Sequence, residues 1–479
     1  MNEKVITFFK EICSIPHGSG NCSKIGDYLL SFAKSRGLWS VRDKKGNVII
    51  KAPAVKRADS DELTTILQAH QDMVCVKEDS CPLDMSKDPL DIMIEDGIIS
   101  AKGTSLGADD GIGVAMILEV LDDTENPRPP IEALFTVDEE TGMSGAAQLD
   151  ASVLKGKKII NLDSEEEGVV TCSCAGGERL DTVIPLTGKD SSERVHVKLY
   201  VSGLAGGHSG CDINKGRLSA LRVLTELLSE LDDLDFALAD LNGGKFDNVI
   251  CSDAYAVISL SPSSCDVSDG RLKKAVDKIL TDCSKTEKGL KITSEITETL
   301  GSDDRKIMGR DETKSFLDAM KKIPQGVTLM MKDRPDSVDT SMNLGKVRSN
   351  GEELLMTFSL RSSCDERRKE LENRVTDALK DIKGCKWNVR DPYPAWRYVA
   401  SSPLRDKICS VYKDLFGKDM ETAITHGGLE CGYFDSKIEG CEIVSIGPQI
   451  DDIHSVKEKI AADSVDRTMQ LLKKVLETV

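Results

Sequence analysis

Four short apolar runs in this 479-residue chain each lead into a histidine or an acidic residue. Such runs, bounded by polar residues, are typical of buried β-strands. In an open α/β sheet, ligands bind beyond the carboxyl ends of the strands. The polar residues are therefore expected to meet at one sheet edge, although they are far apart in the sequence. The runs and their polar residues are TTILQAH with His70 and Asp72, IEALFTV with Glu139 and Glu140, KKIINLD with Asp163, and CEIVSIGP with His454.

A glycine-rich segment supplies one more position. Asp109 lies in GTSLGADDGIGVAM, where a loop is predicted to lead into a helix. A short side chain on a Gly-flanked turn is well fixed, which suits a carboxylate that bridges two ions. A two-metal hydrolase needs such a bridge, and imidazole and carboxylate are groups that Zn²⁺ accepts. The predicted ligands that share Asp109 are His70 and Asp163 on one ion, and Glu140 and His454 on the other.

Two further acids receive supporting roles. Asp72 follows His70 by two residues and is expected on the same side of the strand, where it could accept the other ring N–H of His70. Glu139 and Glu140 cannot both point the same way from an extended end. Glu140 is therefore predicted to bind metal, while Glu139 faces the substrate as general base.

Each of these features alone has an ordinary explanation. A His-x-Asp sequence is a common accident, an adjacent pair of glutamates is usually a solvated surface, and Asp163 could cap a following helical turn. Their coincidence at the ends of core segments favours the metal-hydrolase interpretation.

Composition narrows the class of protein. The chain is 39% hydrophobic and 30% charged, as in globular proteins, and no apolar stretch approaches the roughly 20 residues of a membrane helix. A net charge of −18 with 4% aromatic residues argues against nucleic acid as a partner. The N-terminus lacks the features of a secretory signal, and an odd number of cysteines favours a reducing compartment. We predict a cytoplasmic protein without membrane contact.

Cys172 and Cys174 form a C-x-C sequence of the kind found in zinc sites. No second pair follows at matching spacing, so these two cysteines are expected to pack in the core.

Domain organisation follows from the change of pattern along the chain. Predicted strands and helices alternate to about residue 186, which indicates an α/β layer. The polar stretch TGKDSSERV resembles a linker, and an α+β pattern follows it, with helices expected at 214–231 and 271–285 and a hairpin at Asn350-Gly351. The α/β pattern then returns and carries His454. We therefore predict a mixed-sheet α/β catalytic domain in two segments, residues 1–187 and 393–479, with residues 188–392 as an inserted α+β domain.

The ordered motifs resemble those of the aminoacyl-histidine dipeptidases, or cytosolic non-specific dipeptidases, within a larger family of di-zinc exopeptidases and deacylases. The resemblance covers essentially the whole chain. It implies the ligand set above with Asp109 as bridge, Glu139 as base and Asp72 as the residue that orients His70. It also implies that the inserted domain is a lid that forms a homodimer. The motifs are LQAHQDMV, KGTSLGADDGIGVAM, VDEETGMSGA, INLDSEEEG, CAGG, GLAGGHSG, NGG, TSMNLG, HGGLECGYF and SIGP…HS.

Further substrate contacts are expected from the inserted domain and from the last segment of the chain. His208 in GGHSG is placed to donate to the developing oxyanion, whether from the same subunit or from a partner. Arg361, at the end of a predicted strand, could bind the substrate's terminal carboxylate with two hydrogen bonds; a surface ion pair is the alternative. Weaker candidates for substrate binding are Asn248, Asn343, His426 and Glu430. No role is evident for His17, and His196 is expected to be structural.

The chain departs from the family pattern at two places. VICSDA follows Asn248 where a proline and a basic residue are common, and Asp110 stands where asparagine is common. Neither departure removes a predicted ligand.

These observations predict a dipeptidase with two divalent ions that hydrolyses unblocked dipeptides, Xaa-His dipeptides being among the candidate substrates. Zinc is expected, although Co²⁺ and Mn²⁺ accept the same ligands. Two alternatives stay open: a deacylase or carboxypeptidase that acts on N-acyl amino acids, and an inactive protein that binds peptides.

Overall fold

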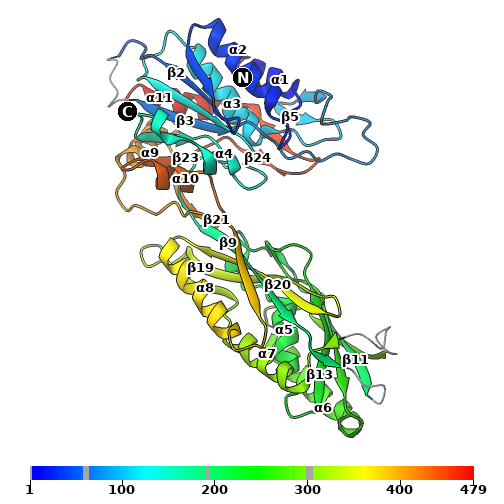
Figure 1. The fold of residues 1–479 in the computed structure, drawn as a ribbon. Coiled ribbons are helices and arrows are strands. Elements are labelled where there is room, and N and C mark those ends of the chain that lie inside the picture. The colour runs from blue at the N-terminus through cyan, green and yellow to red at the C-terminus, as the bar shows by residue number, and fades with distance from the viewer. Residues whose placement is uncertain (1–2, 58–63, 190–193, 284, 298–305) are drawn as a thin grey trace. The chain divides into compact units, whose positions relative to one another are not determined.

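The computed structural model describes residues 3–57, 64–189, 194–283, 285–297 and 306–479, which form two compact units (Figure 1). Unit 1 contains the first and last parts of the chain, and unit 2 is inserted between them. The predicted fold, an α/β unit interrupted by an α+β unit, is confirmed. Unit 1 comprises Met1–Cys174, Trp396–Ile424 and Leu429–Val479, and unit 2 comprises Ala175–Ala395 and Thr425–Gly428.

Unit 1 is built on an eight-stranded mixed sheet. Its strands, in spatial order, are β1 (Trp39–Arg42), β2 (Val48–Ala52), β6 (Ile131–Thr136), β3 (Thr65–His70), β7 (Lys158–Asn161), β23 (Glu442–Ser445), β8 (Val169–Cys174) and β22 (Glu421–Thr425). β3 runs parallel to β6 and β7, and β7 runs parallel to β23. Every residue of β3 and β6 is buried, as expected for parallel strands covered on both faces. The carboxyl ends of four parallel strands therefore lie at one edge.

A second, smaller sheet in unit 1 carries the loop that contains His454. It contains β24 (Ile450–Asp451), β25 (Lys459–Ala461), β5 (Ile98–Ala101) and β4 (Ile92–Glu95), in that order. β24 and β25 form an antiparallel hairpin, and its loop, residues 452–458, carries His454.

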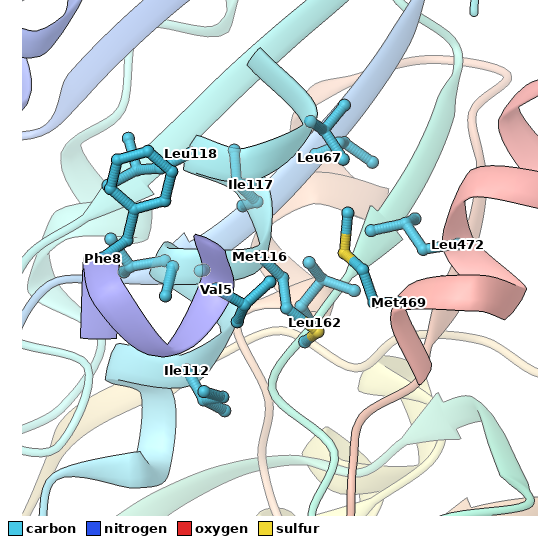
Figure 2. Close-up of a cluster of buried hydrophobic side chains, with 14 of the residues drawn as sticks. Val5, Phe8, Leu67, Ile112, Met116, Ile117, Leu118, Leu162, Met469 and Leu472 are labelled. Atoms are coloured by element: carbon cyan, nitrogen blue, oxygen red, sulfur yellow. The ribbon is translucent and has the colours of Figure 1, made fainter. Parts of the chain in front are cut away.

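The core of unit 1 surrounds one apolar helix. α3 (Ala108–Asp122) is buried at almost every position. Figure 2 shows its side chains packed with residues of α1 (Glu3–Cys13), β3 and α11 (Ala462–Leu476). This packing fixes the start of α3, where Asp109 lies. The other helices of unit 1 are α2 (Ser23–Ser35), α4 (Ser144–Gln148), α9 (Pro403–Phe416), α10 (Cys431–Lys437) and the 3-10 turn Ala151–Val153.

Unit 2 is an α+β unit with its own core. Its main sheet, in spatial order, contains β16 (Lys291–Thr297), β11 (Val195–Ser202), β15 (Ala254–Leu260), β13 (Phe236–Gly243), β19 (Val338–Ser349), β20 (Glu353–Ser362), β9 (Gly176–Pro185) and β21 (Lys386–Tyr393), with β18 (Gly326–Met330) beside β19. The smaller pairs are β12 (Gly207–His208) with β14 (Val249–Ile250), and β10 (Gly188–Lys189) with β17 (Lys306–Ile307). The helices are α5 (Ala220–Ser229), α6 (Pro262–Cys283), α7 (Arg310–Lys322) and α8 (Asp365–Leu379), together with the 3-10 turn Ile213–Lys215. The predicted hairpin is confirmed, since β19 and β20 flank Asn350-Gly351.

Several boundaries differ from those expected, among them the return to unit 1, which comes at Trp396 rather than 393. The units divide at Cys174 and Ala175, earlier than 187, because all ten residues of β9 pair with β20 in the sheet of unit 2. α5 begins at Ala220, not at 214, because Gly216 adopts a left-handed conformation (φ 70°) that ends the preceding turn. α6 begins earlier than 271, at Pro262, and proline fits the first turn of a helix. Residues 190–193 of the predicted linker and residue 284 of the predicted helix lie outside the described residues.

The core packing expected for two cysteines is observed. Cys172 and Cys174 are buried in an apolar cluster of unit 1. Within the described ranges, no helix combines the length and apolar character needed to span a bilayer.

Candidate functional site

The carboxyl-terminal edge of the unit 1 sheet collects the five predicted metal ligands. His70 is the last residue of β3, Asp163 follows β7 by two residues, and Glu140 lies beyond β6. Asp109 lies in the first turn of α3, where its backbone departs from helical geometry (φ −82°, ψ 105°). His454 comes from the hairpin loop and has a positive φ of 56°. The convergence that the strand pattern predicts is present.

Asp109 has a different pair of neighbours at each carboxylate oxygen. Its Oδ1 lies 3.0 Å from Nε2 of His70, which is 3.3 Å from Oδ1 of Asp163. Its Oδ2 lies 3.1 Å from Nε2 of His454, which is 3.0 Å from Oε1 of Glu140. These are the two ligand groups expected when one carboxylate bridges two ions. Compact groups of possible ligand atoms also include His70 with Asp109 and Glu140, and His70 with Asp110 and Asp163.

The hydrogen bonds of His70 suit a cation beside it. Nδ1 lies 3.0 Å from the backbone carbonyl oxygen of Asp72, and a carbonyl only accepts, so Nδ1 donates. In the neutral ring, Nε2 then presents its lone pair to the oxygens of Asp109 and Asp163. Two acceptors that face one lone pair repel each other unless a proton or a metal ion lies between them. The donor set thus fits a metal ion at this position.

Asp72 differs from its expected arrangement. It lies beyond the end of β3, and its carboxylate is 3.6 Å from Nδ1 of His70, whereas its carbonyl oxygen is the closer acceptor. The carboxylate accepts instead from the hydroxyl of Ser19 at 2.8 Å and from the backbone N–H groups of Glu139 and Glu140 at 3.1 and 3.3 Å. One buried aspartate therefore fixes both His70 and the backbone of the adjacent glutamates.

The cluster contains more buried carboxylates than histidines, and this excess shifts several pKa values. The Asp109 and Glu140 carboxylates, within hydrogen-bonding distance, raise the pKa of His454 to about 11. Burial raises the pKa of Asp163 to about 7. Burial also raises the pKa of Glu139 well above its ordinary value, and Asp163, Glu430 and Glu140 add to that rise. Divalent cations would relieve this excess of buried carboxylates.

The stability of the metal-free protein is predicted to fall between pH 6 and 9. The pKa of His454 is raised from 6.5 to about 11 on folding, so its stabilising contribution is fully present below pH 6.5 and is lost as the pH rises towards 11. Metal binding instead strengthens as the ligands lose protons. Ions at a hundred times their Kd would add about 2.7 kcal/mol to the free energy of unfolding. Melting curves at pH 6, 7.5 and 9 with EDTA or Zn²⁺ should show a gap in Tm that widens with pH. A gap that narrows would contradict the assignment of these residues as metal ligands.

Glu430 lies in unit 1 and is fully buried. Its Oε2 accepts hydrogen bonds from Gln68 at 2.7 Å and from Thr136 at 2.6 Å, and Gln68 in turn accepts from Asn161. Burial raises the pKa of Glu430 to about 8. Glu430 therefore bonds directly to β3 and β6, and Gln68 extends this network to Asn161 of β7.

Unit 2 contains a second polar cluster, around Arg361. Arg361 is only 5% exposed, and its guanidinium donates to the Tyr393 hydroxyl at 2.9 Å and to the His426 carbonyl oxygen at 3.3 Å. Its Nε is buried without a hydrogen-bond acceptor, and no ion pair forms with an acidic residue of the described chain. Burying an uncompensated cation is unfavourable, so the cluster suits an anionic ligand. The alternative of a surface ion pair is not observed.

Two histidines lie beside this cation. Burial and Arg361 lower the pKa of His426 to about 3, and its Nε2 lies 2.7 Å from the Ser341 hydroxyl. Nδ1 of His208 accepts from the backbone N–H groups of Gly210 and Cys211 at 3.3 and 3.2 Å. Burial and Arg361 lower the pKa of His208 as well. In the neutral ring, His208 therefore carries its proton on Nε2, where it can donate.

Asn343 and Asn248 have structural contacts in unit 2. The side-chain amide of Asn343 donates to the backbone oxygens of Asp247 and Val249 at 3.2 and 2.9 Å. The carbonyl oxygen of Asn248 accepts from Ser209 at 2.8 Å. Asn343 thus fixes the segment that contains Asn248, and that segment is bonded to the residue after His208.

Several contacting residues have no sequence signal. Ser19 and Gln68 are ordinary loop and strand residues in the sequence, and His17, which has no predicted role, is buried near Asp72 with its Nδ1 bonded to Ile15. Glu458 lies four residues after His454 and bonds the loop before Asp109. A buried carboxylate among polar loop residues cannot be distinguished from a solvated one by spacing alone.

Comparison with known proteins supports the same interpretation. Residues 66–478 match the family described as Peptidase family M20/M25/M40. The cytosol non-specific dipeptidase of Escherichia coli (strain K12) is 33% identical over 473 residues, which cover 98% of this chain and 96% of that protein. The predicted resemblance is thereby confirmed.

Solved structures show the same fold. The aminoacylhistidine dipeptidase from Vibrio alginolyticus matches with a TM-score of 0.91 and 32% identity, covering 100% of this chain and 97% of that chain. The aminopeptidase PepT from Bacillus cereus matches with a TM-score of 0.58 and 16% identity over 99% of this chain and 98% of that chain. The second match shows a shared fold alone.

Proposed function

Because the chain belongs to peptidase family M20/M25/M40, we propose that it is a metal-dependent dipeptidase that hydrolyses unblocked dipeptides, with Xaa-His dipeptides among its candidate substrates. Two relatives that match nearly the whole chain are named as dipeptidases. The observation that carries the proposal is the position of Asp109, whose two oxygens contact separate histidines.

Two divalent ions are the proposed cofactors, with His70, Asp163 and Asp109 around one and His454, Glu140 and Asp109 around the other. Imidazole nitrogen and carboxylate oxygen suit Zn²⁺, and Co²⁺ or Mn²⁺ would accept the same donors. Bound ions of this kind polarise a peptide carbonyl and make water nucleophilic near neutral pH.

Glu139 is the proposed general base. Burial and the neighbouring acids raise its pKa, so the carboxylate would readily take a proton from the attacking water and return it to the leaving amine. Asp72 accepts from the backbone N–H of Glu139 and would hold the base in place while its carbonyl orients His70.

Substrate recognition is proposed for the cluster around Arg361. The unpaired guanidinium would bind the free carboxylate of a dipeptide, and Nε2 of His208 would donate to the oxyanion that forms during attack. Asn343 would hold the segment that contains Asn248. His426 would be held in place by its contact with Ser341. For Glu430 we propose support of the strand ends beside the ligands.

A substrate panel tests this function directly. Free dipeptides and their N-acetylated forms would be incubated with the protein after chelation and after readdition of Zn²⁺ or Mn²⁺. Cleavage of the free dipeptides alone, lost with chelator and restored by metal, is expected. Cleavage of only the acylated compounds would instead indicate a deacylase, and binding without turnover in metal-loaded protein would indicate a peptide-binding protein.

A cytoplasmic homodimer that assembles through unit 2 is the proposed state of the protein. The cytosolic location rests on the name of the Escherichia coli relative. Assembly is supported by β16, which lies at the end of the strand order and carries Ile296 at 77% exposure, since an exposed edge strand can pair with another chain. Light scattering that gives a mass near 52.2 kDa, that of one chain, would refute the dimer.

A further inference from the structure

Glu458 connects the two loops that carry Asp109 and His454. Its side chain is 3% exposed, and it lies in the sequence immediately before β25, at the end of the hairpin loop that contains His454. Oε2 accepts from the backbone N–H groups of Leu106 and Gly107 at 2.8 and 3.1 Å. Oε1 accepts from those of Ala108 and Asp109 at 2.8 and 3.3 Å. Both oxygens are thus occupied by consecutive backbone donors of one loop.

Among the residues that the structure describes, these four N–H groups have no acceptor other than Glu458. The first N–H groups of a helix have no partner within the helix, and here the irregularity extends further, because Asp109 and Asp110 are not helical. Gly107 is left-handed (φ 67°) and packs against Met73 so closely that an added Cβ would lie 2.8 Å from the Met73 sulfur. The packing of α3 holds the start of the helix, but the four N–H groups before and at that start need an acceptor from another segment, and Glu458 supplies it.

The hairpin is itself anchored on the opposite side. β25 pairs with β24 and with β5, and Ala462 donates to the Gly97 carbonyl oxygen. The position of Glu458 is therefore set by the small sheet, and its hydrogen bonds transfer that position to the loop of Asp109. His454 belongs to the same hairpin loop and contacts Oδ2 of Asp109.

We infer that Glu458 is a positioning residue for the metal centre: it sets the distance between the bridging carboxylate of Asp109 and the His454 ligand, and metal affinity depends on it. The inference rests on the proposed two-metal function. It assigns Glu458 no contact with substrate or with the ions.

Two glutamine variants distinguish the positioning role of Glu458 from the general effect of removing a buried negative charge. Glu458→Gln keeps the shape but replaces one acceptor oxygen with an NH₂ group, so two of the four backbone N–H groups would face a donor. Glu132→Gln is the matched control. Glu132 is also buried in unit 1, and its Oε2 accepts from the backbone N–H groups of Lys155 and Gly156 at 2.8 and 3.0 Å. It lies near the start of β6, at the opposite end from the ligands.

Zn²⁺ binding measured by equilibrium dialysis at defined free concentrations is the readout, with the Tm of the metal-free proteins alongside. We expect both variants to lower Tm, but only Glu458→Gln to raise the Kd for Zn²⁺, by about 10–100-fold, the range found for residues that orient metal ligands. Excess Zn²⁺ should restore occupancy in Glu458→Gln. Equal Zn²⁺ affinity in wild type and Glu458→Gln would overturn the inference.

The remaining outcomes are also decisive. Wild-type protein that binds no divalent ion would refute the proposed metal centre itself, which is distinguishable from failure of the inference alone. If Glu458→Gln does not fold, Glu458→Asp, which keeps two acceptor oxygens on a shorter side chain, replaces it in the comparison. Failure of both variants to fold would show that Glu458 is required for folding rather than for metal positioning, and would overturn the inference.

Discussion

Replacing Glu139 with glutamine is expected to lower kcat on free dipeptides by about 10²–10⁴-fold, the usual contribution of a general base. The amide keeps the size of the side chain but cannot take a proton from water. Its backbone N–H would still bond to Asp72, so the neighbouring ligand Glu140 should stay in place. Steady-state kinetics on metal-loaded protein measures the effect.

The Glu140→Gln variant shows how loss of a predicted metal ligand would differ from loss of the base in Glu139→Gln. Glu140 lies 3.0 Å from His454 in the ligand cluster, so its replacement should lower the metal content as well as the rate. Glu139→Gln should retain the metal content of the wild type, as measured by elemental analysis. Near-normal turnover in Glu139→Gln would remove the base assignment, and loss of metal from it would exchange the roles of the two glutamates.

Replacing Arg361 with alanine is expected to reduce kcat/KM for dipeptides by about 10²–10³-fold, since removing one partner of a buried charge pair typically costs 2–5 kcal/mol. This effect is expected because the Arg361 guanidinium lacks an acidic partner in the described chain. The terminal carboxylate of the dipeptide would be that partner. A dipeptide amide, which has no terminal carboxylate, should be a poor substrate for the wild type and should lose little further in the variant.

Arg367→Ala is the matched control in unit 2. The Arg367 guanidinium already pairs with both oxygens of Asp339, at 2.7 and 2.6 Å, so its loss should affect stability but not the preference for a free carboxylate. If Arg361→Ala discriminates between dipeptide and dipeptide amide as strongly as the wild type does, Arg361 does not bind the carboxylate.

Much of the candidate centre could be predicted because parallel strands end at a common edge. His70, Glu140 and Asp163 follow β3, β6 and β7, and the topology brings them together in the way the apolar runs indicate. Their role as metal ligands stays a prediction. The fold class also followed from the pattern, since fully apolar strands and half-buried strands differ in period.

The contacts that hold the centre could not be predicted. Glu458 bonds a loop some 350 residues earlier, and Ser19 reaches Asp72 from a loop near the N-terminus; neither contact leaves a periodic pattern. The boundary at Cys174 was missed for a similar reason, because β9 finds its partners in β20 and β21, which lie far along the chain. Pairing over long sequence separations is set by tertiary packing and not by local preference.

The position of β23 has a consequence for biosynthesis. This strand lies between β7 and β8 in the sheet of unit 1, yet it is made after the whole of unit 2. A nascent chain that ends before Glu442 has an interrupted sheet, with the facing edges of β7 and β8 unpaired, and it lacks His454. The candidate centre is therefore incomplete until synthesis has passed both β23 and His454, long after the other four candidate ligands have been made.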